Sequence, residues 1–404
     1  MINPSSVDMK DRDHFRNHVF PTPFHSRTSK LNVLDDWGRW KDYTTANSYF
    51  DEVLEYFASR NSCAVFDLTP MTKHLISGPD ALPFMERLMT RNVSKLKPGR
   101  VCYSVWCNDE GRVIDDGTIF HLQPGIYRLC SQEPQIDWLL TSALGFDVDI
   151  HEDTHEVAGL ALQGPTSCAV LKKLGLPGIE NLTPFGIAYF PFEGAELMVS
   201  RTGYTGDLGY ELWIEPSHAE LLWDRLFEAG QLLGITPLGS HALEMLRIEA
   251  GFILAGVDFL PAHEAVRPTH TRSPLELGLG WLVDFNKTNF TGRRALLEEQ
   301  RKGSRYQLVK LDIDGNKPAH QSFIFTRDEK FAGTVTSATW SPSAKANIAL
   351  ASLVAPHGKP GEELVAEIYY QRELKWNRVM APCRVVKDVF FDPPRRRMTP
   401  PPDF

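Results

Sequence analysis

The chain lacks the patterns that would place it in a membrane, in the secretory route or on a nucleic acid. No uninterrupted apolar run approaches membrane-spanning length, so we expect no contact with a membrane. The amino end, residues 1–6, lacks the basic start and apolar core of a secretory signal. Basic residues number 43 against 51 acidic residues, a net charge of −8, which argues against a nucleic-acid-binding protein.

The chain has few cysteines, and their spacing does not suggest disulfide or metal-binding pairs. The 404 residues include six cysteines, none of them in a C-x-x-C arrangement, and their neighbours are mostly apolar. This distribution is typical of core thiols in a reduced, cytoplasmic protein, and it favours neither a disulfide framework nor a zinc site. We therefore predict a cytoplasmic protein without a structural metal.

One motif imitates a zinc peptidase. Residues 151–155 read His-Glu-Asp-Thr-His, which matches H-E-x-x-H. That mechanism needs both histidines on one face of a helix, one turn apart. Here residues 146–150 and 157–162 alternate like strands on either side, so the motif is predicted to span a loop between strands. We interpret the match as chance.

The composition, 42% hydrophobic and 23% charged, is that of a globular protein long enough for two or three domains. The first two-thirds of the chain mixes helical and strand patterns. Among them, residues 101–107 and 112–122 are alternating runs joined by a turn-forming Asn-Asp-Glu-Gly, which predicts a hairpin.

After about residue 300 the residue pattern changes from mixed helices and strands to strands only. A charged linker is predicted at residues 298–304, followed by six short strands with Gly and Pro turns, which suggest a small β-barrel or sandwich. The first 30 residues are polar and interrupted by proline, as expected of a loosely held arm. The last residues, rich in Pro and Arg, are predicted to be a tail.

The glycine-rich stretch 201–212 is the part of the sequence around which we organise the rest. Gly203, Gly206 and Gly209 are spaced by three and permit backbone geometry that other residues resist. The strand that follows begins with Tyr210 and Glu211. A partly buried Glu211 would need hydrogen-bond donors, and a ligand with an N–H/NH2 edge has two. A tight turn with a surface glutamate is the alternative.

Asp115 lies in the second strand of the predicted hairpin. It is in phase with Val113 and Ile119, whereas Asp116 is in phase with Arg112 and Thr118, although also with Ile114 and Phe120. The phase thus leans towards an inward Asp115. An inward carboxylate is costly unless it is paired or used, which makes it a functional candidate; an Asp that caps a turn or pairs with Arg is the alternative.

Arg247 occurs on a helix predicted from Ser240 to Gly251, one residue beyond an apolar pair. From that position it could enter a pocket. For a single helical arginine, a surface salt bridge is the alternative.

Taken in order, the motifs resemble the folate-dependent aminomethyltransferase superfamily, which includes the glycine-cleavage T-protein and dimethylsulfoniopropionate demethylase. The similarity runs from about Tyr49 to about Val386. It rests on Phe66-Asp67-Leu68-x-x-Met71, Asn108-Asp109-Glu110-Gly111-x-x-Ile114-Asp115-Asp116, Leu162-Gln163-Gly164-Pro165, Thr202-Gly203-Tyr204-Thr205-Gly206-x-x-Gly209-Tyr210-Glu211, Leu246-Arg247-x-Glu249-Ala250-Gly251, Phe290-Thr291-Gly292-Arg293-x-Ala295-Leu296, and Ser341-Pro342 with Ile348-Ala349-Leu350-Ala351.

The resemblance implies an α+β fold, a ring of three domains around a folate channel. Two interleaved α+β folate-binding domains would occupy residues 49–300 and a C-terminal β-barrel or sandwich residues 305–390. Residues 1–48 would be an N-terminal arm and residues 391–404 the tail.

The resemblance also implies site residues and tetrahydrofolate as the cofactor. Glu211 would pair with the pterin through two charge-assisted hydrogen bonds. Asp115 would be the catalytic aspartate near the reduced pterin nitrogens, where a carboxylate can steer or accept a proton and stabilise a cationic one-carbon centre. Arg247 falls on an arginine that helps to hold the cofactor, and Tyr204 and Tyr210 could line the pterin, although core packing explains them equally well.

Departures from the T-protein pattern concern the substrate. Thr69-Pro70-Met71 stands where that pattern continues Ser-His-Met, and Leu243 replaces a second arginine. Aromatic residues such as Trp106 add surface that could close around an apolar or cationic methyl donor, with packing as the alternative. Thr69, Trp106 and Tyr49 are therefore the candidate substrate contacts.

We predict a tetrahydrofolate-dependent methyltransferase or demethylase acting on a small methylated N-, O- or S-compound. The first alternative is aminomethyl transfer in glycine cleavage, with a lipoyl carrier protein as partner under that reading only. The second is a non-catalytic folate-binding accessory protein, like the superfamily member that helps iron–sulfur assembly. That member carries a Lys-Gly-Cys segment near residues 286–292, whereas this chain has no cysteine between residues 168 and 383.

Overall fold

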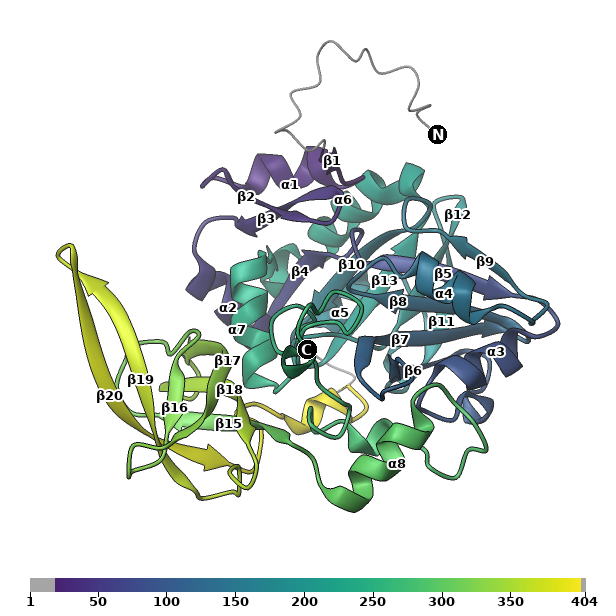
Figure 1. Cartoon of the computed structure of the whole chain (residues 1–404). Helices are drawn as coiled ribbons and strands as arrows, with labels where there is room; N and C mark the ends of the chain where they lie inside the picture. The colour runs from purple at the N-terminus through teal and green to yellow at the C-terminus, as the bar shows by residue number, and fades with distance from the viewer. Residues whose placement is uncertain (1–18, 401–404) are drawn as a thin grey trace, which may run out of the picture.

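Two β-sheets share the centre of the molecule and take their strands from the chain in turn. The computed structural model describes residues 19–400. The six-stranded sheet has the order β11-β12-β13-β10-β4-β14, and the five-stranded sheet has the order β6-β7-β8-β5-β9. The chain enters the first sheet at β4, builds the whole of the second, and returns to the first at β10 (Figure 1). The predicted interleaved α+β fold is confirmed.

The strands of these sheets follow the runs predicted at residues 101–107, 112–122 and 157–162, whereas the run predicted at residues 146–150 is a strand only from residue 149 to residue 152. They are β4 Cys63–Asp67, β5 Thr72–Ser77, β6 Arg100–Cys107, β7 Val113–Gln123, β8 Ile126–Ser131, β9 Asp149–Glu152, β10 Ala158–Gln163, β11 Ile187–Phe192, β12 Ala195–Ser200, β13 Gly209–Ile214 and β14 Ile235–Pro237. The hairpin of β6 and β7 is antiparallel, and its turn is closed by Asn108 Oδ1, which accepts from the Arg112 amide at 2.8 Å.

Helices pack on both the outer and the inner sides of the two sheets. They are α1 His25–Leu31, α2 Glu52–Asn61, α3 Ala81–Leu88, α4 Ile136–Ser142, α5 Ser167–Lys173, α6 Ala219–Gly230, α7 Ser240–Glu249 and α8 Arg293–Lys302. Between residues 19 and 400, no helix has the length and hydropathy needed to cross a bilayer.

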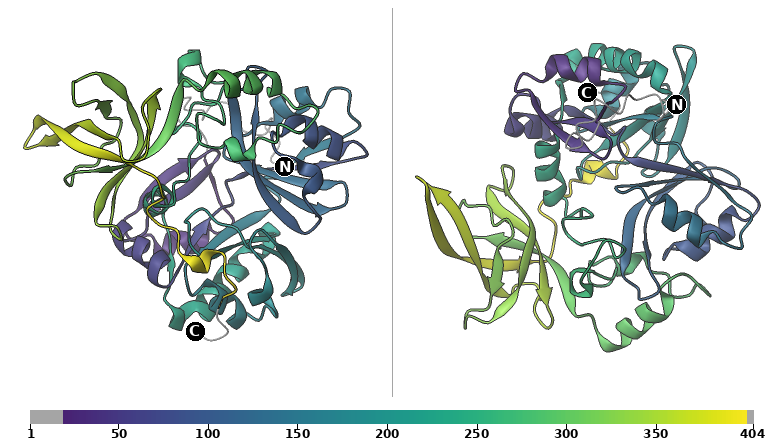
Figure 2. Two further views of the ribbon diagram at one scale, coloured as in Figure 1. Left: turned by 90° about the horizontal axis from the view of Figure 1, so that it is seen from below. Right: turned by 45° about the horizontal axis from the view of Figure 1, so that its top comes forward.

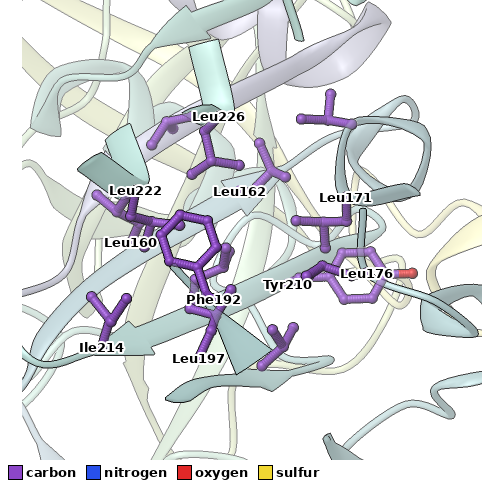
Figure 3. Packing of buried hydrophobic residues seen from close by; sticks show 14 of the residues in the cluster. Leu160, Leu162, Leu171, Leu176, Phe192, Leu197, Tyr210, Ile214, Leu222 and Leu226 are labelled. Atoms are coloured by element: carbon purple, nitrogen blue, oxygen red, sulfur yellow. The ribbon is translucent and has the colours of Figure 1, made fainter. Parts of the chain in front are cut away.

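Three apolar clusters hold the sheets and helices together. One lies between the six-stranded sheet and helices α5 and α6, and Figure 3 shows its closely packed side chains. A second lies under α3 and α4 on the five-stranded sheet. The third joins the inner faces of the two sheets to α2 and α7, and Phe120 and Trp213 meet there edge to face at 5.8 Å. The third cluster sets how the sheets face each other.

The C-terminal lobe is a closed barrel rather than a sandwich, with the order β15-β18-β17-β16-β19-β20. Its strands are β15 Tyr306–Ile313, β16 Phe323–Phe325, β17 Phe331–Ser341, β18 Ala346–Val354, β19 Glu363–Arg372 and β20 Lys375–Val386. The charged linker predicted at residues 298–304 is wrong for its first part. Residues 298–302 complete α8, in which Leu296 packs inward while Glu298, Arg301 and Lys302 face solvent.

The part of the predicted N-terminal arm that the structure describes, residues 19–48, is folded. It forms β1 Phe20–Pro21, α1, β2 Asp36–Trp40 and β3 Tyr43–Ser48, with β3 in the middle of a small sheet. Arg27 holds α1 on α6 through a bidentate pair with Asp224, at 2.8 Å for each contact. Residues 1–18 lie outside the described residues.

The described part of the predicted tail, residues 391–400, also packs on the protein, whereas residues 401–404 lie outside the described residues. It runs from the barrel back to the lobe of the six-stranded sheet (Figure 2). Arg395 donates to both carboxylate oxygens of the fully buried Asp207, at 2.6 and 2.8 Å. The guanidinium of Arg60 lies 3.6 Å from the ring centroid of Phe391. The segment thus lies against the glycine-rich loop.

A buried ionic network fastens the barrel to the rest of the protein. Glu249, on α7, accepts from Tyr56 at 2.6 Å and from Arg60 at 2.7 and 3.1 Å, and Ser341 of the barrel also donates to it. Arg60 and Glu249 are 3% and 1% exposed. One carboxylate therefore joins α2, α7 and β17.

Replacing Glu249 with glutamine should lower the free energy of unfolding by about 3 kcal/mol, because the variant removes the carboxylate nearest to the buried Arg60 and leaves, among the described residues, only Asp207, 3.9 Å away and already paired with Arg395. Urea denaturation of the purified protein measures this change. The matched control is Glu228→Gln, whose side chain is 70% exposed and whose effect should stay within ~0.5 kcal/mol. Equal effects from the two variants would contradict the role of the network.

Candidate active site

Glu211 is the third residue of β13, an inner strand of the six-stranded sheet, and lies on the face that meets the other sheet. Its neighbours Tyr210 and Leu212 point the opposite way, into the cluster under α5 and α6. Glu211 is 8% exposed, and its Oε2 accepts from Thr202 at 2.5 Å and from Ser200 at 3.4 Å. The carboxylate is therefore buried with hydroxyl donors on one oxygen.

The glycine spacing before Glu211 serves close packing around Gln163. A Cβ on Gly203 or on Gly209 would lie 1.9 or 2.4 Å from the Gln163 side chain. That amide donates to the carbonyls of Thr202 and Tyr210, at 3.2 and 3.3 Å. The loop is thus wrapped on one buried glutamine, which fixes the Thr202 hydroxyl beside Glu211.

The charge and the hydrogen-bonding capacity of Glu211 are only partly satisfied by the described residues. Burial raises the pKa of its carboxyl to about 7, although the Thr202 and Ser200 hydroxyls act in the opposite direction. Among residues 19–400, no donor reaches Oε1 and no basic side chain pairs with the group. A buried carboxylate in this state needs further N–H donors. The aminopyrimidinone edge of a pterin carries two adjacent ones, so the site fits the expected cofactor.

A β-bulge decides where the two hairpin aspartates point. Trp106 pairs with Asp115 and Cys107 pairs with Val113, so Ile114 is an extra residue in β7. Asp115 therefore shares the face of Trp106 and Ile114, which pack in the cluster under α3 and α4. The predicted alternation of inward and outward residues along β7 runs across this bulge, and the extra residue shifts that alternation by one position.

Asp115 is fully buried and satisfied by neighbouring groups. Its Oδ2 accepts from the Glu133 amide at 3.2 Å and from Gln135 at 3.3 Å, and its Oδ1 accepts from the Asp116 amide at 2.8 Å. Burial, and then the charge of Asp116, raise the pKa of Asp115 well above its ordinary value. This carboxyl favours its neutral form.

Asp116 points to the other face of the sheet. It lies opposite Val105, on the side of Tyr103 and Phe120, and Tyr103 donates to its Oδ2 at 2.7 Å. Burial raises the pKa of Asp116 to about 6. Because Phe120 meets Trp213, two residues from Glu211, Asp116 lies on the sheet surface that faces the Glu211 strand. Asp116 was not predicted as a site residue, because the bulge cannot be recognised in the residue pattern.

Arg247 is fully buried, and protein groups use all its N–H donors. It donates to Asp258 at 2.7 Å, to the Phe252 carbonyl at 2.9 Å and to Ser337 of the barrel at 2.7 Å, and it makes two hydrogen bonds with Glu244. Arg247 thus ties α7 to the barrel. A contact between Arg247 and a cofactor would require one of these bonds to be exchanged.

The two tyrosines predicted to line the pterin lie in different places. Tyr204 is half-buried, donates to the Ile253 carbonyl and stacks on Phe252 with 5.6 Å between ring centroids. Tyr210 is fully buried in the cluster on the opposite face of the sheet from Glu211 (Figure 3). Strand alternation separates Tyr210 from Glu211, so its role as a pterin contact is not supported.

The three candidate substrate contacts are all inside the protein. Trp106 has no exposed surface and packs under α3 and α4, and Tyr49 is 2% exposed. Thr69 is 1% exposed, and its hydroxyl accepts from the Gly159 amide at 3.2 Å. Packing thus accounts for Trp106 and Tyr49. Thr69 belongs to a segment that ends at the half-buried Met71.

Lys73 is buried next to that segment and donates hydrogen bonds to its backbone. Its ammonium group donates to the carbonyls of Thr69 and Met71, at 2.9 and 2.7 Å, and has no exposed surface. Burial lowers the pKa of Lys73 to about 8. The sequence pattern did not single out this residue, because only the fold shows that its charge is buried.

The histidine motif at residues 151–155 does not form a metal site. His151 lies in β9, exposed, and pairs with Glu156 at 2.8 Å, whereas His155 lies in the following turn beside Tyr43. Residues 19–400 contain no group of three or more potential metal ligands. All six cysteines are free and buried.

The raised pKa of Glu211 predicts a pH-dependent stability. Between its ordinary value of 4.5 and about 7, the folded protein holds a proton that the unfolded chain has lost. The contribution of Glu211 to the free energy of unfolding therefore falls as the pH rises through this window, by ~3 kcal/mol in all. Urea denaturation at several pH values should show wild type losing stability relative to Glu211→Gln from pH 4.5 to 7, and parallel curves would refute this.

Comparisons with known proteins identify the family of the chain. Residues 25–287 match the family model of the GCVT N-terminal domain, and residues 307–392 match that of the glycine cleavage T-protein C-terminal barrel domain. The chain is similar to an aminomethyltransferase of Halothermothrix orenii, with 34% identity over 340 residues, which cover 83% of this chain and 91% of that protein.

Two further similarities extend over most of the chain. A trimethylamine-oxide aldolase of Ruegeria pomeroyi is 34% identical over 391 residues, 93% of this chain but 47% of that protein. The crystal structure of the glycine cleavage system aminomethyltransferase T from Bartonella henselae superposes with a TM-score of 0.80 at 25% identity, covering 93% of this chain and 98% of that one. The chain therefore belongs to the glycine cleavage T-protein family of one-carbon transferases.

Proposed function

We propose that this protein transfers a one-carbon unit from a small methylated N-, O- or S-compound to tetrahydrofolate. The observation that carries the folate assignment is Glu211, a buried carboxylate with donors on Oε2 and none, within the described residues, on Oε1. A pterin edge would complete its hydrogen bonds in the ionised form, as a bidentate pair. Tyr204 and Phe252, already stacked, are the aromatic residues suited to lie along the ring system.

Bound tetrahydrofolate would supply a weakly basic ring nitrogen as the acceptor of the one-carbon unit. The chain would contribute a pair of adjacent carboxyl groups with different proton affinities. Asp116, with a pKa of about 6 and a hydrogen bond from Tyr103, is mostly ionised at neutral pH, whereas burial and the charge of Asp116 raise the pKa of Asp115 well above its ordinary value. Asp116 is thus suited to accept a proton or to stabilise a cationic centre.

The choice of a methylated donor rests on two observations. The similarity to the trimethylamine-oxide aldolase covers 391 residues, against 340 for the aminomethyltransferase of Halothermothrix orenii at the same identity. In addition, the segment that contains Thr69 departs from the T-protein pattern. The chain corresponds to about half of the Ruegeria protein, so the donor of that protein is a guide to chemical class only.

The second candidate function is aminomethyl transfer in glycine cleavage. The aminomethyltransferase relatives and the Bartonella henselae structure favour it. Under this alternative the partner would be a lipoyl carrier protein that presents the aminomethyl group. Both candidates use the same folate site and differ in the donor.

The substitution Asp116→Asn should lower the rate of one-carbon transfer by about 10²- to 10⁴-fold, because a proton acceptor is lost. The Kd for tetrahydrofolate should change little, because Glu211 remains in place to bind the pterin. The same measurements on Asp115→Asn separate the two aspartates. Asp109→Asn, an exposed change in the turn of the same hairpin, is the control. Wild-type rates for both Asp115→Asn and Asp116→Asn would contradict the proposed role of the aspartates.

Glu211→Gln should weaken tetrahydrofolate binding by ~10- to 100-fold, because the charge-assisted pair with the pterin edge is lost. A binding titration with tetrahydrofolate measures this change.

The donor is identified by incubating the enzyme with tetrahydrofolate and a panel of methylated amines, amine oxides, ethers and sulfonium compounds. Mass spectrometry then detects methyl- or methylene-tetrahydrofolate. We expect a product without any carrier protein. Product formation only when an aminomethylated lipoyl carrier protein is present would favour the second candidate and overturn the first.

A further inference from the structure

The turn between β2 and β3 carries a lysine from the N-terminal segment to the five-stranded sheet. β2 and β3 pair as a hairpin, and Lys41 lies in the turn that joins them. Trp40, the last residue of β2, packs on the third apolar cluster, with 6.1 Å between its ring centroid and that of Phe66. This contact anchors the turn where the two sheets meet.

The ammonium group of Lys41 pairs with the carboxylate of Glu133, which belongs to the loop between β8 and α4. The two side chains are 28% and 18% exposed, so both charges are largely removed from water. The carbonyl of Glu133 accepts from Ser131 at 2.9 Å, which ties the loop to the end of β8. The ion pair therefore joins the N-terminal segment to a loop of the five-stranded sheet.

The same loop holds the carboxyl group of Asp115. The Glu133 amide donates to its Oδ2 at 3.2 Å, and Gln135, which is 3% exposed, donates to the same oxygen at 3.3 Å. The other oxygen, Oδ1, accepts from the Asp116 amide at 2.8 Å. A continuous series of contacts thus leads from Lys41 to the backbone of Asp116.

Lys41 also acts on Asp115 through its charge. Burial and the charge of Asp116 raise the pKa of Asp115, and the positive charge of Lys41 opposes this shift. Further charges that act on the ammonium group are those of Glu264, Asp42 and Arg39. Loss of Lys41 would therefore change both the geometry and the charge at the aspartate pair.

A salt bridge that serves stability alone is the alternative. Ion pairs at protein surfaces contribute little to stability. The pair of Lys302 with Glu298 is of this kind, since its side chains are 74% and 56% exposed. The pair of Lys41 with Glu133 differs, because Glu133 also binds Asp115 through its backbone. The position of Lys41 therefore affects the aspartates directly.

We propose that Lys41 is a positioning residue for the one-carbon transfer. By pairing with Glu133 it keeps the loop on Asp115, whose Oδ1 holds the backbone of the neighbouring Asp116. The inference rests on the proposed function, and it adds the N-terminal segment to the site. A misplacement of ~1 Å can lower a rate about 10²-fold, so a residue that does not touch the substrate can control the reaction. Binding of tetrahydrofolate should depend little on Lys41, because Glu211 lies on the other sheet.

Hydrogen exchange of the full-length protein, followed by mass spectrometry, tests the contact without any donor. Lys41→Met should raise the exchange rate of the amides at residues 131–136 by about 10-fold, because the loop is no longer held on Asp115. Lys41→Arg keeps the positive charge and should keep the wild-type exchange. Lys30→Met, at an exposed lysine of α1, is the control and should exchange as wild type does. Peptides from β13 should stay protected in every variant, which shows that the fold is retained.

Kinetics with the donor found in the panel above separate positioning from stability. Lys41→Met should lower kcat by about 10- to 100-fold, while the Kd for tetrahydrofolate changes by less than about 2-fold. Lys41→Arg should recover most of the rate. Glu133→Gln should lower kcat to a similar extent. The double variant Lys41→Met/Glu133→Gln should be no slower than either single variant, because the two residues act through one contact.

Failure of this inference is distinguishable from failure of the proposed function. Unchanged exchange at residues 131–136 in Lys41→Met would overturn the positioning role even if wild type forms methyl- or methylene-tetrahydrofolate. A wild-type kcat in a variant whose exchange has risen would overturn it as well, and so would additive losses in the double variant. If wild type forms no folate product from any donor, the proposed function fails, and the positioning role fails with it.

Discussion

The packing of two interleaved sheets against each other, at the contact of Phe120 with Trp213, is the constraint on which the candidate site depends. In each strand, neighbouring side chains alternate between faces. Once this contact fixes the inner faces, Asp116 and Glu211 must both point to the space between the sheets. Two carboxyl groups that are almost a hundred residues apart in sequence thereby belong to one region, and burial changes the proton affinity of both.

Buried charges also hold the barrel in place. Glu249 and Arg247 lie two residues apart on α7, and each binds one group of opposite charge and one serine of the barrel. Glu249 binds Arg60 and Ser341, whereas Arg247 binds Asp258 and Ser337. Buried ion pairs contribute little net stability compared with apolar packing, but they are costly to break. The network therefore fixes one orientation of the barrel relative to α7.

Local alternation and turn chemistry made much of this structure predictable. The hairpin of β6 and β7, the strand that carries Glu211 and the six barrel strands all follow from residue patterns. The bulge at Ile114 was not predictable, because it depends on how β7 fits its neighbours. Nor was the role of Arg247, whose partner Ser337 is 90 residues away in the sequence. Long-range partners decide such positions, and a single sequence does not record them.

The clamp of Arg395 on Asp207 has a consequence for the order in which the protein is made. Asp207 belongs to the loop that precedes Glu211, and its counter-ion Arg395 leaves the ribosome 188 residues later. Until then Asp207 has no bidentate partner, and Phe391 does not cover Arg60. A nascent chain can fold both sheets before that point, but the glycine-rich loop reaches its final support only after residue 395 has been made.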